Sequence, residues 1–173
     1  EIYPHLGASS VLTPNVQWRF QSGAKVTFAH MFYEKEKYNW QGSQIPLLMF
    51  DELVHFTESQ FFYMFSRNRS TCGVRPYIRA TCNPDGESWV ARFIDWWIDP
   101  ETGYADESRC GKLRYFIRRN NIIHWADTPQ QLYEEFHLYS PEEMEEVKSV
   151  SFISAKLTDN AAMMKHDPGY IGA

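Results

Sequence analysis

The amino-acid sequence predicts an α/β fold built on parallel strands, and three observations support this prediction. Residues 45–50 form a short apolar run that ends at two adjacent acids, Asp51 and Glu52. Residues 75–82 form a second strand-like run, which ends in small polar residues. A helical pattern separates the two runs and predicts a strand–helix–strand unit. The carboxyl ends of parallel strands meet at one edge of a sheet, where ligands bind in such folds.

Length and composition set the frame for this prediction. A chain of 173 residues suits one domain, or one domain with an appendage, and a hydrophobic content of 43% is enough for a core. The formal net charge of −5 argues against a generally basic nucleic-acid-binding protein. The charges are nevertheless segregated, because residues 59–84 contain four arginines and no acid, whereas residues 134–146 contain six glutamates and no Lys or Arg.

The three cysteines are Cys72, Cys82 and Cys110, and no two of them have C-x-x-C spacing. This number and spacing predict neither a zinc site nor a disulfide framework, and they suit a reducing compartment. No stretch approaches 18 apolar residues, and no signal or transit peptide is visible. We therefore expect no contact with a membrane.

Residues 1–44 predict a loose opening over residues 1–14, followed by a β-hairpin of residues 16–20 and 25–30. The mixed charges of residues 31–44 indicate a solvated face or loop, which Gly42 ends in a turn. Pro46 can open a strand but not lie inside one. The run that follows is apolar on both faces, which predicts a buried central strand.

After the two acids, Thr57 with Gln60 three residues later forms a capping box. The helix that begins there should run to about Arg67 and bury an aromatic face of Phe61, Met64 and Phe65. His55 follows Glu52 by three residues without forming a His-Glu-x-x-His zinc pattern. It is either a support for the acids or a packed histidine.

The second half of the chain predicts further helices and strands. Residues 88–98 form an amphipathic helix whose aromatic stripe is typical of a core, and residues 112–118 and 122–125 form a second hairpin. Its basic residues either contact a nucleic-acid backbone or pair with an acidic helix over residues 129–147; they are Lys112, Arg114, Arg118 and Arg119. Residues 150–155 form a last strand, and Thr158 caps a helical turn that residues 167–170 break.

The Asp51-Glu52 pair has two interpretations. Acids at this place can cap the following helix, because carboxylates suit a helix N-terminus. Alternatively, an apolar strand that ends in Asp-Glu resembles the Walker B element of ATPases, in which Asp51 would hold Mg²⁺ and Glu52 would orient the attacking water. Residues 81–83 and the Pro-Asp-Gly turn after them form either a phosphate-contacting tip or an ordinary turn.

Residues 42–97 carry the more specific resemblance. The segments Leu-Leu-Met-Phe-Asp-Glu-Leu-Val-His-Phe-Thr-Glu, Ser-Arg-Asn-Arg-Ser and Arg-Ala-Thr-Cys-Asn-Pro-Asp-Gly-Glu-Ser-Trp are similar to those of the large terminase subunit of tailed bacteriophages. That family is the ATP-driven motor that packages DNA into proheads. Residues 112–116 and 151–160 resemble its lid region, so the similarity covers most of the chain.

The resemblance implies a partial P-loop NTPase core of the additional-strand, RecA-like type, with three α/β/α layers. Residues 1–100 would be a truncated ATPase core, and residues 101–173 a small α+β lid and linker region. The implied cofactors are ATP and Mg²⁺. Asp51 would be the Mg²⁺ residue and Glu52 the catalytic carboxylate. The coupling motif would be Thr81, Cys82 and Asn83, with Thr81 or Asn83 contacting the γ-phosphate or the lytic water.

Motors of this family act as homo-oligomeric rings in which a neighbour's arginine completes the site. Many relatives place that arginine beside a glycine upstream of the Walker B strand, where this chain has Gln41-Gly42. Arg67 and Arg69 are therefore the candidate arginine fingers, with simple charge pairing at a helix end as the alternative. The implied partners are double-stranded DNA, the portal protein and the small terminase subunit. The implied location is the cytoplasm of the infected bacterial host, with transient docking on the prohead.

Two parts of the family pattern do not occur in the sequence. It contains no G-x-x-x-x-G-K-[ST] pattern, which would cradle the phosphates, and no acid-rich nuclease domain follows the lid region. We therefore expect an internal piece of a longer chain, one that begins after the Walker A unit and does not hydrolyse ATP by itself.

Three other functions remain open. One is a helicase-like DNA translocase. Another is a non-catalytic nucleic-acid-binding or virion-associated module with a degraded ATPase core. The third, a metal nuclease built on Asp51 and Glu52, has the least support. Two-metal sites need carboxylates from several elements, and the further acids Asp85, Asp95 and Asp99 do not obviously converge on that pair.

Overall fold

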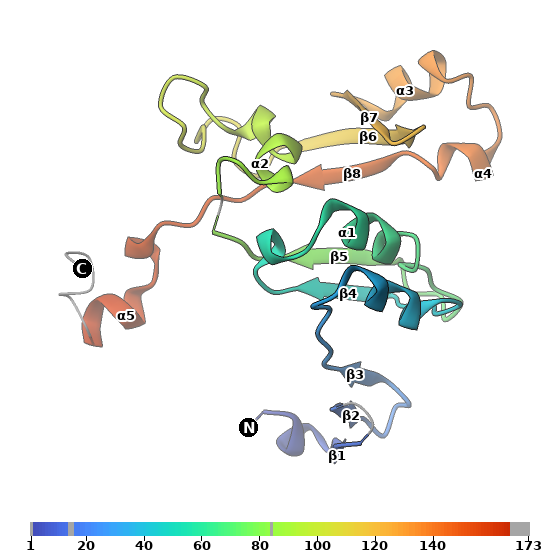
Figure 1. Cartoon of the computed structure of the whole chain (residues 1–173), viewed down its shortest axis with the longest axis vertical. Helices are drawn as coiled ribbons and strands as arrows, with labels where there is room; N and C mark the ends of the chain where they lie inside the picture. Colours follow the sequence, from blue (N-terminus) through green and yellow to red (C-terminus); the bar gives the residue numbers. More distant parts are fainter. Residues whose placement is uncertain (1, 14–15, 84, 167–173) are drawn as a thin grey trace. The chain divides into compact units, whose positions relative to one another are not determined.

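The protein is described by a computed structural model that covers residues 2–13, 16–83 and 85–166 (Figure 1). It divides into two compact units, residues 1–91 and 92–173. The division falls within the short helix α2 (Trp89–Phe93), ahead of the boundary at residue 100 that the sequence suggests.

The first unit begins with a small antiparallel sheet of three strands in the order β1-β2-β3. The strands are β1 (Ser9–Val11), β2 (Gln17–Arg19) and β3 (Lys25–Thr27), and a 3-10 helix, η1 (Tyr3–Leu6), precedes them. The hairpin of β2 and β3 confirms the prediction. The prediction of a loose opening over residues 1–14 was wrong, because η1 and β1 lie in this segment. The centroid of the Tyr3 ring lies 5.5 Å from that of Trp18, and this contact anchors the segment.

The strand–helix–strand unit is confirmed. Strand β4 (Leu47–Phe50) and strand β5 (Tyr77–Ala80) pair in parallel, with Leu48 opposite Ile78. Between them lie the 3-10 helix η3 (Leu53–His55) and helix α1 (Glu58–Phe65). The capping box forms as predicted: Gln60 N donates to Thr57 Oγ1 at 3.0 Å, and Thr57 N donates to Gln60 Oε1 at 2.9 Å.

Strand β4 is buried on one face only, so the prediction of a strand buried on both faces was wrong. Leu48 and Phe50 are buried, and the ring of Phe50 lies 5.4 Å from that of Phe61 in α1. Leu47 is 39% exposed and Met49 is 74% exposed. Side chains alternate across a strand, and helix α1 covers the face that carries Leu48 and Phe50.

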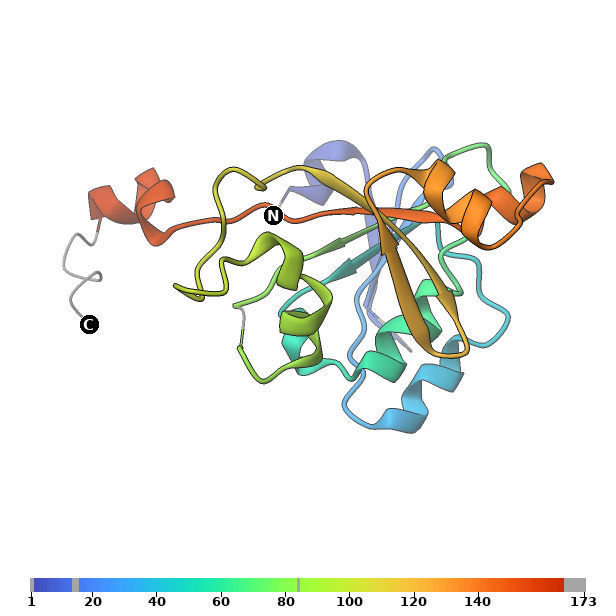
Figure 2. The ribbon, with the colours of Figure 1, turned by 90° about the horizontal axis from the view of Figure 1, so that it is seen from above.

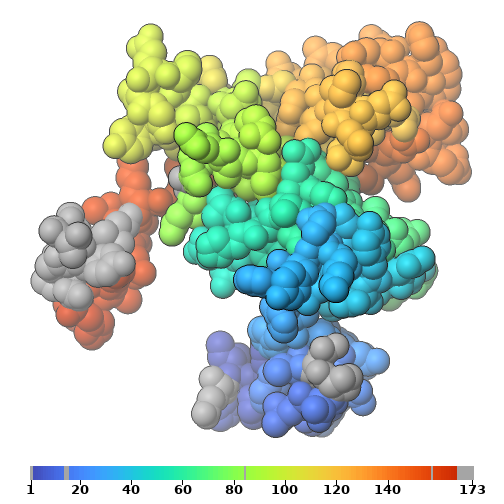
Figure 3. All heavy atoms as spheres, in the orientation of Figure 1, coloured from blue at the N-terminus to red at the C-terminus, as the bar shows by residue number. Residues whose placement is uncertain are grey.

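Residues 31–44, for which the sequence indicates a solvated face or loop, contain the largely solvent-exposed 3-10 helix η2 (Glu34–Trp40). This helix lies beside α1 (Figure 2). In the space-filling view, atoms of the two helices form one continuous surface (Figure 3). Helix α1 ends at Phe65, near the predicted end; Phe61 and Met64 are buried as expected, whereas Phe65 is only partly buried.

The prediction of one continuous helix over residues 88–98, which span the division between the units, is wrong. Helix α2 is followed by a separate 3-10 helix, η4 (Asp95–Trp97). The break is at Ile94, whose φ of −109° and ψ of 9° leave the helical region. Phe93 and Trp97 are core as expected, whereas Trp89 and Trp96 are only partly buried; Trp97 is 1% exposed, and its Nε1 donates to the main-chain oxygen of Lys112 at 3.1 Å.

The second predicted hairpin is confirmed. Strands β6 (Leu113–Arg119) and β7 (Ile122–Ala126) pair in antiparallel fashion, and β8 (Lys148–Ser151) joins the other edge of β6. Asn120 and Asn121 connect β6 to β7 with φ of 51° and 64°. Two positive φ values at a two-residue loop are typical of a type I′ turn, and asparagine tolerates this conformation.

The acidic helix predicted over residues 129–147 is two helices, α3 (Pro129–Glu135) and α4 (Pro141–Met144). His137 separates them with a φ of 55°, and Ser140 begins α4 by accepting a hydrogen bond from Glu143 N. The core between this segment and the sheet consists of Ile117, Ala126, Leu132 and Leu138.

Two basic residues of β6, Arg114 and Arg119, form ion pairs. Arg119 pairs with Glu146, which follows α4, so one pair to the acidic segment forms as the sequence suggested. Arg114 pairs instead with Asp127, at 3.0 Å between Nε and Oδ1. The guanidinium of Arg114 also lies 4.8 Å from the ring centroid of Trp96.

The described chain closes with η5 (Leu157–Asp159) and α5 (Ala161–His166), where a helical turn was predicted. The predicted helix breaker at residues 167–170 lies outside the described residues. None of the described helices has the length and apolar character that crossing a bilayer requires.

Candidate functional site

The candidate site lies at the carboxyl ends of β4 and β5. The parallel pairing continues just beyond the strands, since Thr81 N donates to Phe50 O at 3.0 Å and Leu53 N donates to Thr81 O at 2.8 Å. Asp51 and Glu52 therefore lie beside Thr81, although Asp51 and Thr81 are 30 residues apart in sequence. The structure brings together the two polar strand ends that the sequence singled out.

The hydroxyl of Thr81 contacts both acidic residues. Its Oγ1 donates to Asp51 Oδ1 at 2.8 Å and accepts from the main-chain nitrogen of Glu52 at 3.3 Å. A third contact joins Asn83 N to Glu52 Oε2 at 3.4 Å. The end of β5 thus contacts the Asp51 carboxylate through a side chain and the Glu52 carboxylate through one main-chain nitrogen.

Glu52 has a left-handed backbone conformation, with φ of 53° and ψ of 64°. This conformation costs a residue other than glycine about 1–2 kcal/mol. Leu53 N donates to Thr81 O at 2.8 Å, and the buried side chain of Leu53 anchors the next residue in the core. Backbone strain of this kind is concentrated at functional sites.

Asp51 presents an exposed carboxylate at the strand end. Such a donor fits Mg²⁺, because this ion is held in nucleotide sites by one or two carboxylates together with water and substrate phosphates. Among residues 2–13, 16–83 and 85–166, no three side chains of His, Cys, Asp or Glu come together as a possible metal cluster.

Cys82 is partly buried between the two exposed residues of its tripeptide. Burial raises the pKa of its thiol above the usual value of 9.0, and the negative charge of Glu52 raises it further. The thiol is therefore protonated at neutral pH, whereas nucleophilic attack and metal binding both need the thiolate. The partly buried thiol is therefore poorly suited to either role.

His55 and the two candidate arginines lie apart from this arrangement. His55 N donates to Glu52 O at 2.9 Å, but within the described residues its exposed imidazole makes no hydrogen bond to either acid. Arg67 O accepts from Ile45 N at 3.0 Å, which places the start of the Arg67–Arg69 segment at the opening end of β4. Four residues of strand separate that end from Asp51, a distance of about 13 Å.

The loops of the site are held by contacts that the sequence did not reveal. The indole Nε1 of Trp89 donates to Phe56 O at 2.7 Å, and its ring lies 5.1 Å from that of Phe61. At the other end of the strands, Asn68 Nδ2 donates to the main-chain oxygens of Ile45 at 2.9 Å and Tyr77 at 3.2 Å. No local pattern reveals either set of contacts, because they join segments that are separated in sequence.

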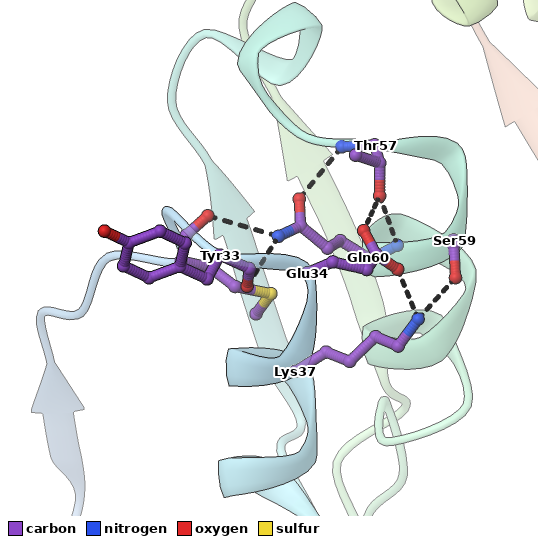
Figure 4. Close-up of polar contacts among 7 residues, drawn as sticks. Tyr33, Glu34, Lys37, Thr57, Ser59 and Gln60 are labelled. Carbon is purple, nitrogen blue, oxygen red and sulfur yellow. Dashed lines mark hydrogen bonds and ion pairs between the residues drawn. The ribbon is translucent and has the colours of Figure 1, made fainter.

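A polar network in which Lys37 and Gln60 are buried holds the start of α1 against η2 (Figure 4). Lys37 is 7% exposed, and its Nζ donates to Glu34 Oε1 and to Ser59 Oγ. Thr57 Oγ1 donates to Glu34 Oε2 at 2.6 Å. The hydrogen bond from Lys37, followed by that from Thr57, lowers the pKa of Glu34 to about 2.

Gln60 completes the network and is 2% exposed. Its Nε2 donates to the main-chain oxygens of Met31 at 3.3 Å and Tyr33 at 3.2 Å, while its Oε1 caps α1. The capping box marked Gln60 in the sequence, but not its burial. These contacts fix the first turn of α1, which follows Glu52 after η3.

The comparisons with known proteins give one match. The family described as "Terminase large subunit, T4likevirus-type, N-terminal" matches residues 4–172, nearly the whole chain. No curated protein and no solved structure matched it.

Proposed function

This chain belongs to the terminase large-subunit family of the T4likevirus type, which indicates a role in phage DNA packaging, and from that premise we propose that it forms part of the packaging motor's ATPase. In this proposal, ATP hydrolysis drives translocation of double-stranded DNA into the prohead. The β4–α1–β5 unit would be part of a P-loop NTPase core with three α/β/α layers. The ATP-hydrolysing form would be the product of the full reading frame, with a nuclease outside residues 1–173.

The observation that carries the proposal is the meeting of Asp51 and Glu52 with Thr81 and Asn83 at one sheet edge. Mg²⁺ bound with ATP would neutralise charge on the phosphate oxygens. Asp51 would hold that ion with its carboxylate. Glu52 would orient the attacking water and accept its proton, as a positioned general base does. Asn83 would sense the γ-phosphate, because its side chain is exposed beside Glu52.

The positions of Arg67 and Arg69 favour action in trans. Both lie toward the end of the strands that is opposite to Asp51, so neither reaches the site of its own chain in this arrangement. In a homo-oligomeric ring, either could complete the site of a neighbour. Arg67 already stacks at 5.0 Å from the ring of Tyr63, which holds its guanidinium in place. The portal protein and the small terminase subunit would be further partners of this ring.

The test is the ATPase rate of the full reading frame with Glu52→Gln, Asp51→Asn and the control Glu87→Gln, an exposed acid in the loop after β5. Loss of a general base should lower kcat by about 100-fold or more. Asp51→Asn should raise the Mg²⁺ concentration needed for half-maximal rate, and Glu87→Gln should match the wild type.

A second candidate is a non-catalytic nucleic-acid-binding or virion-associated module with a degraded ATPase core, which would be favoured if the full reading frame also lacked a G-x-x-x-x-G-K-[ST] pattern. If Glu52→Gln hydrolyses ATP like the wild type, the motor assignment fails. Binding of double-stranded DNA without any ATPase activity would then support the module.

A further inference from the structure

The hydroxyl of Thr81 joins the two acids of the site to each other. It donates its single proton to Asp51 Oδ1 at 2.8 Å and accepts from Glu52 N at 3.3 Å. The main-chain oxygen of the same residue accepts from Leu53 N at 2.8 Å. With the hydrogen bond from its main-chain nitrogen to Phe50 O, Thr81 therefore contacts four consecutive residues at the end of β4.

This use of the hydroxyl conflicts with a direct role in phosphate binding. A threonine hydroxyl has one proton to donate, and a phosphate oxygen is only an acceptor. While Thr81 donates to Asp51, it cannot also donate to a γ-phosphate. Asn83 differs, because its main-chain nitrogen is the group that contacts Glu52 and its side chain is exposed.

The contacts also explain how Glu52 keeps its left-handed conformation. The main-chain nitrogen of Glu52 points to Thr81 Oγ1, and that of Leu53 points to Thr81 O. Hydrogen bonds on both sides of the strained residue offset the cost of its positive φ. The same hydroxyl orients Asp51, so the orientations of the two carboxylates depend on each other.

We propose that Thr81 is a positioning residue that sets the geometry of Asp51 and Glu52 together and makes no phosphate contact. This inference rests on the proposed ATPase function and gives two residues of the coupling tripeptide different roles. Thr81 positions the acids, and Asn83 contacts the γ-phosphate. Removal of the hydroxyl should therefore affect Mg²⁺ dependence and kcat together.

The experiment compares Thr81→Val, which keeps the shape without the hydroxyl, with Thr81→Ser, which keeps the hydroxyl. It measures ATPase activity of the full reading frame over a range of Mg²⁺ and ATP concentrations. Loss of a group that orients a metal ligand costs about 10–100-fold in activity or metal affinity. Thr81→Val should show this loss in kcat and should need more Mg²⁺, with little change in KM for ATP. Thr81→Ser should keep kcat and the Mg²⁺ requirement close to those of the wild type.

The matched control is Thr71→Val, because Thr71 is also exposed and its Oγ1 donates to one side chain, Gln44 Oε1, at 3.2 Å. It should leave kcat and Mg²⁺ dependence unchanged. Melting temperatures of Thr81→Ser and Thr71→Val should stay close to that of the wild type, and that of Thr81→Val should fall by only about 2–4 °C, since Thr81 is exposed. Wild-type kinetics in Thr81→Val, or an equal loss in Thr81→Ser, would overturn the proposal.

A second measurement does not depend on hydrolysis. Amide hydrogen exchange, read by NMR, should be about tenfold or more faster for Glu52 in Thr81→Val and unchanged in Thr81→Ser, because only the former lacks the acceptor for that amide. Equal exchange in the two variants would rule out the positioning role. If Glu52→Gln retains wild-type ATPase activity, the proposed function fails, while the exchange result still decides whether Thr81 holds Glu52.

Discussion

The indole Nε1 of Trp89 lies 2.7 Å from the main-chain oxygen of Phe56 and donates a hydrogen bond to it. Trp89 begins α2, which follows the polar end of β5, whereas Phe56 lies between η3 and α1, just after the acids. This contact ties together the two loops that leave the candidate site. It holds them in addition to the hydrogen bonds between the strand ends.

Trp89→Phe should destabilise the protein by about 1 kcal/mol, because it removes this hydrogen bond and leaves a partly buried carbonyl without its donor. The smaller ring can still pack on Phe61, which lies 5.1 Å from the indole. Chemical denaturation gives the free energy of unfolding. A variant as stable as the wild type would show that the hydrogen bond contributes nothing to the folded state.

The strain at Glu52 can be measured by comparing Glu52→Gly with Glu52→Ala. Both variants lack the carboxylate, but only glycine adopts a φ of 53° without a steric cost. Glu52→Gly should therefore be the more stable of the two by about 1 kcal/mol, after the greater entropy of glycine in the unfolded chain is taken into account. Urea denaturation of both variants makes the comparison, and greater stability of the alanine variant would contradict the left-handed conformation.

Gln60→Leu should lower the stability of the first unit by about 1–3 kcal/mol, because three main-chain groups lose a buried hydrogen-bond partner. Those groups are Thr57 N, Met31 O and Tyr33 O. Gln130→Leu is the control, since Gln130 is an exposed residue of helix α3. Equal melting temperatures for the two variants would show that the polar network in Figure 4 does not stabilise the fold.

The low pKa of Glu34 predicts a defined dependence of stability on pH. The pKa is about 2 in the folded chain, against 4.5 as its ordinary value, because Lys37 and Thr57 donate to the carboxylate. A lowered folded-state pKa stabilises the fold above pH 4.5, and this contribution is lost as the pH falls from 4.5 through 2. Its size is limited by solvent screening, since the Glu34 side chain is 48% exposed.

The measurement is the unfolding free energy of the wild type and Glu34→Gln between pH 6 and pH 2, where both curves can be compared directly. Glu34→Gln should be less stable at pH 6, and the difference should shrink as the pH approaches 2. Glu87→Gln, which replaces an exposed acid, serves as the control. A constant difference between wild type and Glu34→Gln over this range would exclude the proposed ion pair as its source.

Local patterns were enough to predict the elements whose signals lie in adjacent residues. The capping box of Thr57 and Gln60, the Asn120-Asn121 hairpin and the parallel pair around residues 45–50 and 75–82 all formed. The polar ends of β4 and β5 met because parallel strands place their carboxyl ends together. The helix predicted over residues 88–98 failed because Ile94 left the helical region within an otherwise amphipathic pattern.

The sequence by itself determined where the chemistry-bearing residues stand along the chain, because strand ends and helix caps depend on neighbouring residues. Only the tertiary structure decided how they are used. It showed that the Thr81 hydroxyl donates a hydrogen bond to Asp51, that Glu52 has a left-handed backbone conformation, and that Lys37 is buried beside Ser59. These facts depend on contacts between segments 22 to 30 residues apart, and a hydrogen bond over that separation leaves no mark in local periodicity.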